Sequence, residues 1–380
     1  MLTVNRPLNG HKHTSAKNKK ARERAMEAFT RQAVTQDEPE LVIGQANMKV
    51  IGVGGAGSNM VSWLYKKGIK GASIVACNTD TQHLNITDAD YKFLIGRNVT
   101  RGLGCGGMPA KGAESAQEAL QEIKSQLKGS DMVFVCAGMG GGTGTGAAPV
   151  IGQIAKDSGA IVIGTVTMPF SIERARIDKA EYGLSQLRNV CDTVIVIDNN
   201  KLVKIAGNLP VQQAFAVANE LISTMIRGIV ETITVPSLVN LDFADVKAIM
   251  RSGGVAAIGI GASDTANRVE EAVKGALSNP LLDITYDGAE GALIHIEGGP
   301  DMTLEEVARA GDLVTEKLDE SANVIWGARV SEHMKGKIVV MTIITGVHSP
   351  WIVGKDQGPA SKHISAEKRL MKRELGIEVI

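Results

Sequence analysis

The sequence predicts an α/β protein built on a parallel sheet, and three observations support this. Short apolar runs alternate with helix-like stretches over much of the chain, as in a parallel sheet with helices on both faces. Two glycine-rich turns, at 52–57 and 138–146, each follow an apolar run and open a helical stretch. The length of 380 residues suggests about two domains.

Composition places the chain among ordinary globular proteins. Hydrophobic residues make up 44% and charged residues 22%, and 41 Lys and Arg balance 41 Asp and Glu. This balance gives no argument for a nucleic acid partner. No apolar run reaches the roughly 20 residues of a membrane helix, and the N-terminus lacks the apolar core of a signal peptide. We therefore expect a cytoplasmic protein with no direct transmembrane segment.

The four cysteines also fit a reducing compartment, because none of them form a C-x-x-C pair. Cys77 and Cys136 lie in strand-like runs, where we expect buried thiols. Cys105 lies in a glycine-rich loop, where a thiol can be exposed. The sequence gives no strong reason to expect a reactive cysteine.

Residues 1–45 are predicted to form a flexible basic arm, with a short helix from Lys17 to Ala33. We favour a solvated tail over docking to an acidic partner or a membrane surface. The folded part then begins with a strand over 48–53, and the turn Gly54-Gly55-Ala56-Gly57-Ser58-Asn59 opens a helix that ends at Gly68. Taken alone, this turn suggests a Rossmann-type dinucleotide-binding fold.

The next strand, 72–77, ends in Asn78-Thr79-Asp80. Asp80 can accept a hydrogen bond from a ribose hydroxyl or reach a metal on a phosphate, and a simple Asx turn would use the same residues. The following segment, 96–107, carries two arginines among spaced glycines. It can order around a terminal phosphate, or its residues after Gly104 can form a mobile surface loop.

A helix over 109–127 and a strand over 131–136 lead to the second glycine run, Gly138–Gly146. Glycines let the backbone approach a ligand closely, and the free N–H groups at the start of the next helix favour an anion. Pro149 suits the first turn of that helix. The run therefore predicts an anion cradle.

Strands at 161–167 and 193–197 flank a helix at 178–188, and the loop 168–176 is polar enough to hold a ribose. The carboxyl ends of parallel strands meet at one edge of a sheet. We therefore expect every loop described so far to converge on one site.

A long buried helix is predicted from 211 to about 232, with Phe215, Asn219, Ile222 and Ile226 on one face. A smaller second domain follows, in which Asp242 is typical of a helix cap and Asp245 falls in the first turn. Its strands are expected at 255–261, 292–297, 322–328 and 337–344, and its helices at 265–277 and 303–318. The last segment is a tail with a charged helix at 365–375 and an apolar end that suits a partner-binding hook.

These motifs resemble the tubulin/FtsZ family of GTPases, and most closely its prokaryotic cell-division branch. The run 140–146 matches the signature phosphate loop of that family, and the resemblance extends from about Met48 to Val347. It implies a Rossmann-type GTPase domain, a long central helix and a smaller α+β C-terminal domain. The expected division is an arm at 1–45, a GTP-binding domain at 46–210, a central helix at 211–235, a C-terminal domain at 236–347 and a tail at 348–380. The tails depart most from bacterial members and would fit an archaeal origin.

The resemblance implies binding of GTP or GDP with Mg²⁺, without a confident set of side-chain ligands for the metal. Guanine would be read by Asn199 and Asn219, with Phe215 packing on its ring. Asn219 stands where the family often has Asp, and Arg174 stands where it usually has Gly. The residues implied to bind the nucleotide are Gly54, Gly55, Ala56, Gly57, Asn59, Asn78, Asp80, Thr100, Arg101, Gly102, Gly138, Gly140, Gly141, Gly142, Thr143, Gly144, Thr145, Gly146, Pro169, Glu173, Arg176, Asn199, Phe215 and Asn219.

The resemblance also implies that the catalytic site is shared between two subunits. Asn240, Asp242 and Asp245 match the residues that complete the site of the next subunit. The chain is thus expected to be a polymerisation-dependent GTPase that forms head-to-tail filaments of the mid-cell division ring. Membrane-anchoring proteins would bind its C-terminal tail.

Two other functions are weaker. A nicotinamide-dependent oxidoreductase would explain the first glycine turn but not the second, and the second domain offers it no convincing acid or base. A scaffold that binds GTP without hydrolysis would not need Asp242 and Asp245. Binding of GTP rather than NAD, and release of phosphate, would separate the three.

Overall fold

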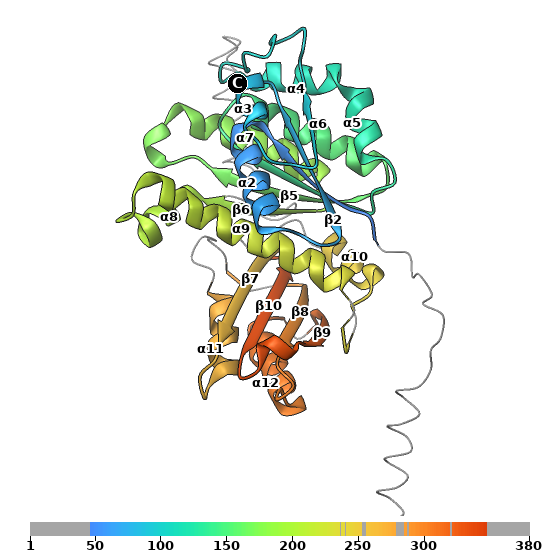
Figure 1. The fold of residues 1–380 in the computed structure, drawn as a ribbon, viewed down its shortest axis with the longest axis vertical. Helices are drawn as coiled ribbons and strands as arrows, with labels where there is room; N and C mark the ends of the chain where they lie inside the picture. The colour runs from blue at the N-terminus through green and yellow to red at the C-terminus, as the bar shows by residue number, and fades with distance from the viewer. Residues whose placement is uncertain are drawn as a thin grey trace, which may run out of the picture. The chain divides into compact units, whose positions relative to one another are not determined.

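The computed structural model describes residues 46–235, 237–239, 241–252, 256–278, 285–286, 289–319 and 321–347. The predicted helices at 17–33 and 365–375, the apolar end of the tail and Asn240 lie outside the described residues. The described residues form two sheets, and the long helix α9 (Val211–Thr234) lies between them (Figure 1).

The larger sheet has six parallel strands in the order β3-β2-β1-β4-β5-β6. The order reverses direction between β1 and β4, and such a switch point opens a crevice at the carboxyl ends of the strands. Five of the strands were predicted, and β3 was missed because only Phe93 of its four residues is buried. Their bounds are β1 (Met48–Val53), β2 (Ala72–Asn78), β3 (Tyr91–Leu94), β4 (Met132–Gly138), β5 (Ile161–Met168) and β6 (Thr193–Asp198).

The central strands are nearly continuous apolar runs because helices cover both faces of the sheet. Ile51 on β1 and Phe134 on β4 are completely buried. The helices of this part are α2 (Gly54–Lys67), α3 (Thr81–Asn85), α4 (Pro109–Glu118), α5 (Leu120–Leu127), α6 (Thr143–Asp157), α7 (Ala175–Val190) and α8 (Asn199–Ala206), with a 3₁₀ turn η1 (Ser171–Glu173) before α7.

Two predictions about these helices were wrong. The stretch 109–127 is two helices, because Ala119 has φ −91° and ψ 15° and leaves the helical region between α4 and α5. Helix α6 begins at Thr143 inside the glycine run, so Pro149 is its seventh residue and not part of the first turn. The earlier start places glycines and threonines at the free N–H groups of the helix.

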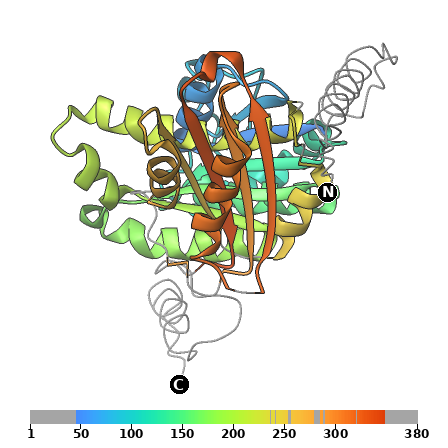
Figure 2. The same ribbon diagram turned by 90° about the horizontal axis from the view of Figure 1, so that it is seen from below.

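The smaller sheet has the order β7-β10-β8-β9, with β10 antiparallel to both neighbours and β8 parallel to β9. Figure 2 shows it in orange and red across the view. Its elements are α10 (Phe243–Ser252), β7 (Ala256–Ser263), α11 (Arg268–Leu277), β8 (Gly291–Gly298), α12 (Leu304–Thr315), β9 (Asn323–Val330), η2 (Glu332–Met334) and β10 (Ile338–Thr345). All four predicted strands are present, with ends shifted by one or two residues.

Helix α9 joins the two parts and is buried along its second half. Ile222, Ile226 and Ile229 are each at most 2% exposed. Phe215, near its start, is 41% exposed. The predicted face of the helix therefore begins with an exposed aromatic side chain and continues with side chains buried in the core.

Candidate nucleotide-binding site

The two predicted glycine turns meet at the switch point between β1 and β4. A Cβ added to Gly54 would lie 2.9 Å from the backbone nitrogen of Gly144, and one on Gly144 would lie 2.6 Å from the carbonyl oxygen of Gly138. Real Cβ atoms do not come this close, so the two backbones can touch only because these residues are glycine. The predicted convergence of the two turns is confirmed.

Two glycines in these turns are not required by packing. No described atom lies within 4 Å of a Cβ added to Gly141, and at Gly55 only the His83 Nε2 atom lies in that range, at 3.9 Å. Both residues lie beside the starts of α2 and α6, whose first N–H groups lack helical partners. The open space at these two positions forms a cradle that suits a phosphate group.

The hydroxyl groups of the second turn are partly engaged. Thr145 Oγ1 accepts a hydrogen bond from the Gly140 N–H at 2.9 Å, which holds the turn in shape. Thr143 Oγ1 lies 2.6 Å from Thr79 Oγ1, and the Cys105 Sγ atom lies 3.4 Å from Thr79 and 3.5 Å from Thr143. Thr79 and Cys105 were not predicted as site residues, because their contact joins segments far apart in sequence.

All four cysteine thiols are buried. Cys105 is 4% exposed, so its position in a glycine-rich loop does not expose it. Burial raises the pKa of Cys136 to about 12 and raises the pKa values of Cys77 and Cys191 as well. All four cysteines are free.

Asp80 and the loop that follows it lie together at the edge of the cradle. Asp80 Oδ1 accepts from the N–H groups of Gln82 and His83, at 2.9 and 3.1 Å, and so caps α3. One carboxylate oxygen of Asp80 therefore forms the Asx turn that the sequence allowed as an alternative to ligand binding. Asp80 also forms a β-bridge with Leu103, which ties the arginine-bearing loop to β2.

The same loop is ordered by further hydrogen bonds. Thr100 Oγ1 donates to the Gly96 and Thr79 carbonyl oxygens at 3.0 and 3.3 Å. Lys179 Nζ donates to the Gly107 carbonyl oxygen at 2.7 Å. Arg101 is exposed and has a positive φ of 55°. The residues after Gly104 therefore form a loop that is tied to α7 and to the phosphate turn.

The residues predicted to bind the ribose lie close together, and two of them form an ion pair with each other. Glu173 Oε1 accepts from the Phe170 N–H at 3.0 Å, and Glu173 Oε2 pairs with Arg176 at 2.5 Å. Arg174 has φ +32°, a conformation that favours glycine and stores strain in other residues. A Cβ on Gly140 would lie 2.8 Å from the Arg176 carbonyl oxygen and 3.4 Å from Pro169, so this loop flanks the phosphate turn.

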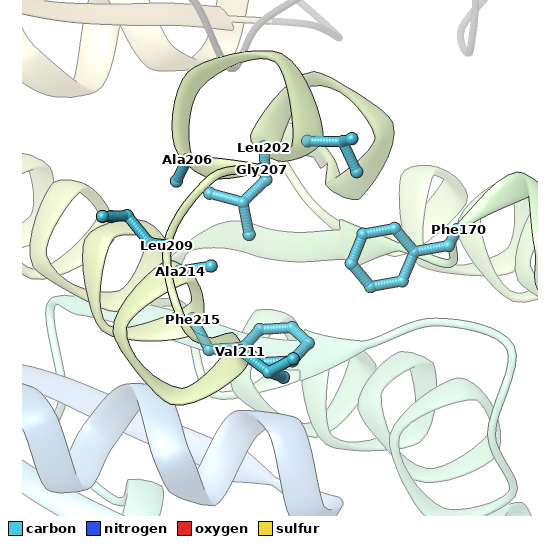
Figure 3. A pocket seen from close by; sticks show the side chains of 9 residues that line it. Phe170, Leu202, Ala206, Gly207, Leu209, Val211, Ala214 and Phe215 are labelled. Carbon is cyan, nitrogen blue, oxygen red and sulfur yellow. The ribbon is translucent and has the colours of Figure 1, made fainter.

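The predicted guanine end combines aromatic rings with an apolar pocket (Figure 3). Phe170 and Phe215 pack edge to face, with ring centroids 6.0 Å apart. Beside them a cavity of about 270 Å³ is lined by Phe170, Leu202, Val203, Ala206, Gly207, Leu209, Val211, Ala214 and Phe215. Phe170 was not predicted as a base contact.

The two predicted amide side chains lie at this end of the site, and a neighbouring asparagine already bonds to another part of the protein. Asn199 begins α8 and Asn219 lies on α9 one turn after Phe215, each half-buried. Asn200 Oδ1 instead accepts from the Ser171 backbone N–H and hydroxyl, both at 2.9 Å. Asn200 therefore orders the ribose loop, and Asn199 and Asn219 are the predicted amides at this end.

Asp242 and Asp245 lie elsewhere. Asp242 Oδ1 accepts from the Asp245 N–H at 2.7 Å, which confirms the predicted helix cap at the start of α10. In Figure 1, α10 lies next to α9, away from α3 and the carboxyl ends of the parallel strands. Within one subunit, the cradle and these carboxylates are therefore separate.

The part of the chain that the structure describes contains no group of three or more His, Cys, Asp or Glu side chains able to hold a metal ion. None of the helices found there has the length and apolar character needed to cross a bilayer. A Mg²⁺ ion held mainly by phosphate oxygens and water needs few protein ligands, and Asp80 is a carboxylate at the edge of the cradle.

Comparison with known proteins agrees with this geometry. Residues 47–207 match the sequence model described as Tubulin/FtsZ family, GTPase domain, and residues 254–348 match FtsZ family, C-terminal domain. Cell division protein FtsZ 2 of Methanocaldococcus jannaschii is 57% identical over 319 residues, which cover 83% of this chain and 84% of that protein.

Solved structures give the same result. An FtsZ dimer of M. jannaschii, described as empty, is 43% identical, with a TM-score of 0.74 over 88% of this chain and 98% of the other. CetZ2 from Haloferax volcanii, described as a GTPγS-bound protofilament, is 25% identical, with a TM-score of 0.71 over 86% and 99%.

Proposed function

The chain belongs to the tubulin/FtsZ family, in its branch of FtsZ cell-division GTPases, and from this premise we propose that it hydrolyses GTP at a site completed by a second subunit. The observation that carries the proposal is the open space at Gly55 and Gly141, where packing does not require glycine. A phosphate group placed there would meet the free N–H groups of two helices.

The nucleotide would lie along the carboxyl ends of the strands. Its phosphates would occupy the cradle, its ribose would lie by Glu173 and Arg176, and its base would lie by Phe215 and Phe170. The Glu173–Arg176 ion pair would have to open or share its carboxylate with a ribose hydroxyl. Asn199 and Asn219 would read the guanine edge, since amides both donate and accept hydrogen bonds.

Phosphoryl transfer depends on positioning and charge stabilisation. The chain has no lysine in its phosphate turn, so backbone N–H groups and helix dipoles would supply the fixed positive field. Mg²⁺ would neutralise phosphate charge when bound, and Asp80 is the residue predicted to reach it. Asp242 and Asp245 of the next subunit would orient the attacking water, together with Asn240, which lies outside the described residues.

This arrangement requires a head-to-tail contact. The cradle and the α10 carboxylates lie on different parts of one subunit, so repeating the contact builds a filament and not a closed dimer. The protofilament of the H. volcanii relative supports such assembly. We propose that these filaments form the division ring at mid-cell in the cytoplasm, with membrane-anchoring proteins bound to the tail.

The domain boundaries are part of the proposal. The GTP-binding domain would span 46–210, the central helix 211–235 and the C-terminal domain with the trans-acting loop 236–347. The segments 1–45 and 348–380 would be an arm and a tail outside the GTPase fold.

The test is hydrolysis as a function of protein concentration. Phosphate release per subunit should rise with concentration, and Asp245→Ala should abolish the rise while leaving GTP binding intact. Asp312→Ala, which removes an exposed carboxylate from α12, is the matched control and should behave like the parent chain. Activity that is independent of concentration, or that survives Asp245→Ala, would refute the shared site. Tight binding of NAD and not GTP would refute the nucleotide assignment.

A further inference from the structure

The segment between α9 and α10 is tied to β9, one of the two edge strands of the smaller sheet. The Val239 N–H donates to the Ala328 carbonyl oxygen at 3.0 Å, and the Ala328 N–H donates to the Val239 carbonyl oxygen at 3.2 Å. An edge strand presents backbone groups that need partners. Here those groups hold the segment that leads directly to Asp242.

The contact is close enough to require glycine at position 327. A Cβ on Gly327 would lie 2.8 Å from Leu241 Cγ and 2.9 Å from the Val239 carbonyl oxygen. Leu241 is 4% exposed, so its side chain is enclosed and has little freedom to move aside. Leu241 and the Val239 carbonyl group therefore pack directly against the backbone of Gly327.

The carboxylates follow immediately from this anchored segment. Asp242 is the next residue after Leu241, and its Oδ1 atom holds the Asp245 N–H at 2.7 Å. The helix that carries Asp245 is fixed in turn by Val246, Ile249 and Met250, all buried. A displacement of Leu241 would therefore move Asp242 first, because the rest of α10 is held in the core.

We propose that β9 positions the trans-acting carboxylates through Gly327 and Ala328, and that Gly327 is a positioning residue for hydrolysis in the neighbouring subunit. This inference rests on the proposed function. Gly327 would touch neither nucleotide nor water, and its effect would pass through its contacts with Val239 and Leu241 to Asp242. GTP binding depends on the cradle of the same subunit and should not depend on Gly327.

The first experiment compares Gly327→Ala with Gly311→Ala. No described atom lies within 4 Å of a Cβ added to Gly311 on α12, so the second variant adds the same methyl group without a contact. Displacement of catalytic groups by about 1 Å can cost two orders of magnitude, so we expect Gly327→Ala to lower kcat about tenfold or more. GTP affinity should match that of the parent chain, and Gly311→Ala should change neither quantity.

A mixing experiment separates a misplaced loop from general damage. Gly141→Asp adds a negative charge to the cradle at a position where an added Cβ meets no described atom within 4 Å, and it should abolish GTP binding while leaving the α10 carboxylates intact. Gly327→Ala, in contrast, should bind GTP normally but carry displaced α10 carboxylates. Equal amounts of the two variants should hydrolyse GTP faster than the sum of each alone, because the loop of one completes the site of the other.

The outcomes distinguish this inference from the function on which it rests. If Asp245→Ala is inactive but Gly327→Ala keeps parental kcat, the inference is wrong and the shared site stands. If Asp245→Ala is active, the shared site itself is wrong. A mixture no faster than the sum also overturns the inference. If Gly327→Ala does not fold by circular dichroism, Val239→Pro weakens the same bridge by deleting one of its two hydrogen bonds, and the same loss of kcat and rescue by mixing are expected.

Discussion

At the scale of single residues, His295 on β8 is a buried titratable group with a strongly lowered pKa. It is 7% exposed, and its Nδ1 atom has no hydrogen-bond partner among the described residues. Glu297 and Arg329 lie beside it and form an ion pair at 2.6 Å, while Arg227 and Glu231 of α9 line the same small cavity. Burial, with help from Arg329, lowers the pKa of His295 to about 4.

This shift predicts loss of stability in mild acid. Below pH 6.5 the unfolded chain binds a proton at His295, but the native imidazole stays neutral until about pH 4. The free energy of unfolding should therefore fall as the pH drops from 6.5 towards 4, by up to about 1.4 kcal/mol per pH unit from this residue. Above pH 6.5 the residue contributes no pH dependence.

Urea unfolding at several pH values between 7.5 and 4.5 measures the effect. His295→Gln should flatten the dependence, because the unfolded state no longer gains a proton that the native state refuses. His333→Gln, at an exposed position in η2, is the matched control. Equal slopes for the parent chain and His295→Gln would show that other groups cause the acid sensitivity.

Single residues also show which features of the site could be predicted from the sequence and which could not. The glycine run was recognisable, but only the structure separates Gly144, which packing requires, from Gly141, which faces open space. The pairing of Glu173 with Arg176 follows from side-chain positions that no pattern encodes. Cys105 meets Thr79 and Thr143 across long sequence separations.

At the scale of elements, α11 lies directly on the backbone of β7. A Cβ on Gly261 would lie 1.9 Å from the Ala272 carbonyl oxygen, and one on Gly259 would lie 1.5 Å from that of Ala276. Glycines at alternate positions of the strand thus create a flat surface for the helix. The other face of β7 is turned to α9, where Ile260 lies near Gly228.

This contact predicts a large cost for one methyl group. Gly261→Ala must push α11 away from β7, and overpacking of this kind typically costs about 1–3 kcal/mol or more. Gly311→Ala in α12 has free space and should stabilise the protein by about 0.5–1 kcal/mol through helix propensity. Urea unfolding gives both values. Equal stability of the two variants would mean that α11 can move off the strand without cost.

Elements were predictable where periodicity was strong and less so where tertiary contacts set their limits. The buried strands of the large sheet are continuous apolar runs and were found, whereas β3 exposes three of its four residues at least partly. The start of α6 at Thr143 was missed because glycine usually disfavours helix. The bridge between Val239 and β9 lies between segments almost ninety positions apart and has no local signal.

At the scale of the whole molecule, the two halves of the proposed site lie on different parts of the chain. The cradle is formed by residues 54–57 and 138–146 at the carboxyl ends of the parallel strands, and Asp242 and Asp245 open a helix beside the smaller sheet. A single subunit would then bind GTP but hydrolyse it slowly. Assembly and hydrolysis would be coupled by geometry, without a separate regulatory element.

The same organisation predicts that the basic arm is not needed for catalysis. The first strand of the large sheet begins at Met48, and the described part of the chain begins at Ala46. The match to the GTPase family likewise begins at residue 47. Deletion of residues 1–40 removes no described part of the cradle, of β9 or of the α10 carboxylates.

We therefore expect the chain lacking residues 1–40 to keep a kcat within about twofold of the full chain, because these residues precede both the first described strand and the match to the GTPase domain. Phosphate release should be measured across a range of protein concentrations for both chains. An unchanged plateau reached at a higher concentration would assign the arm to the subunit contact. Loss of the plateau itself would contradict the prediction, since residues 46–380 would then not contain the whole catalytic unit.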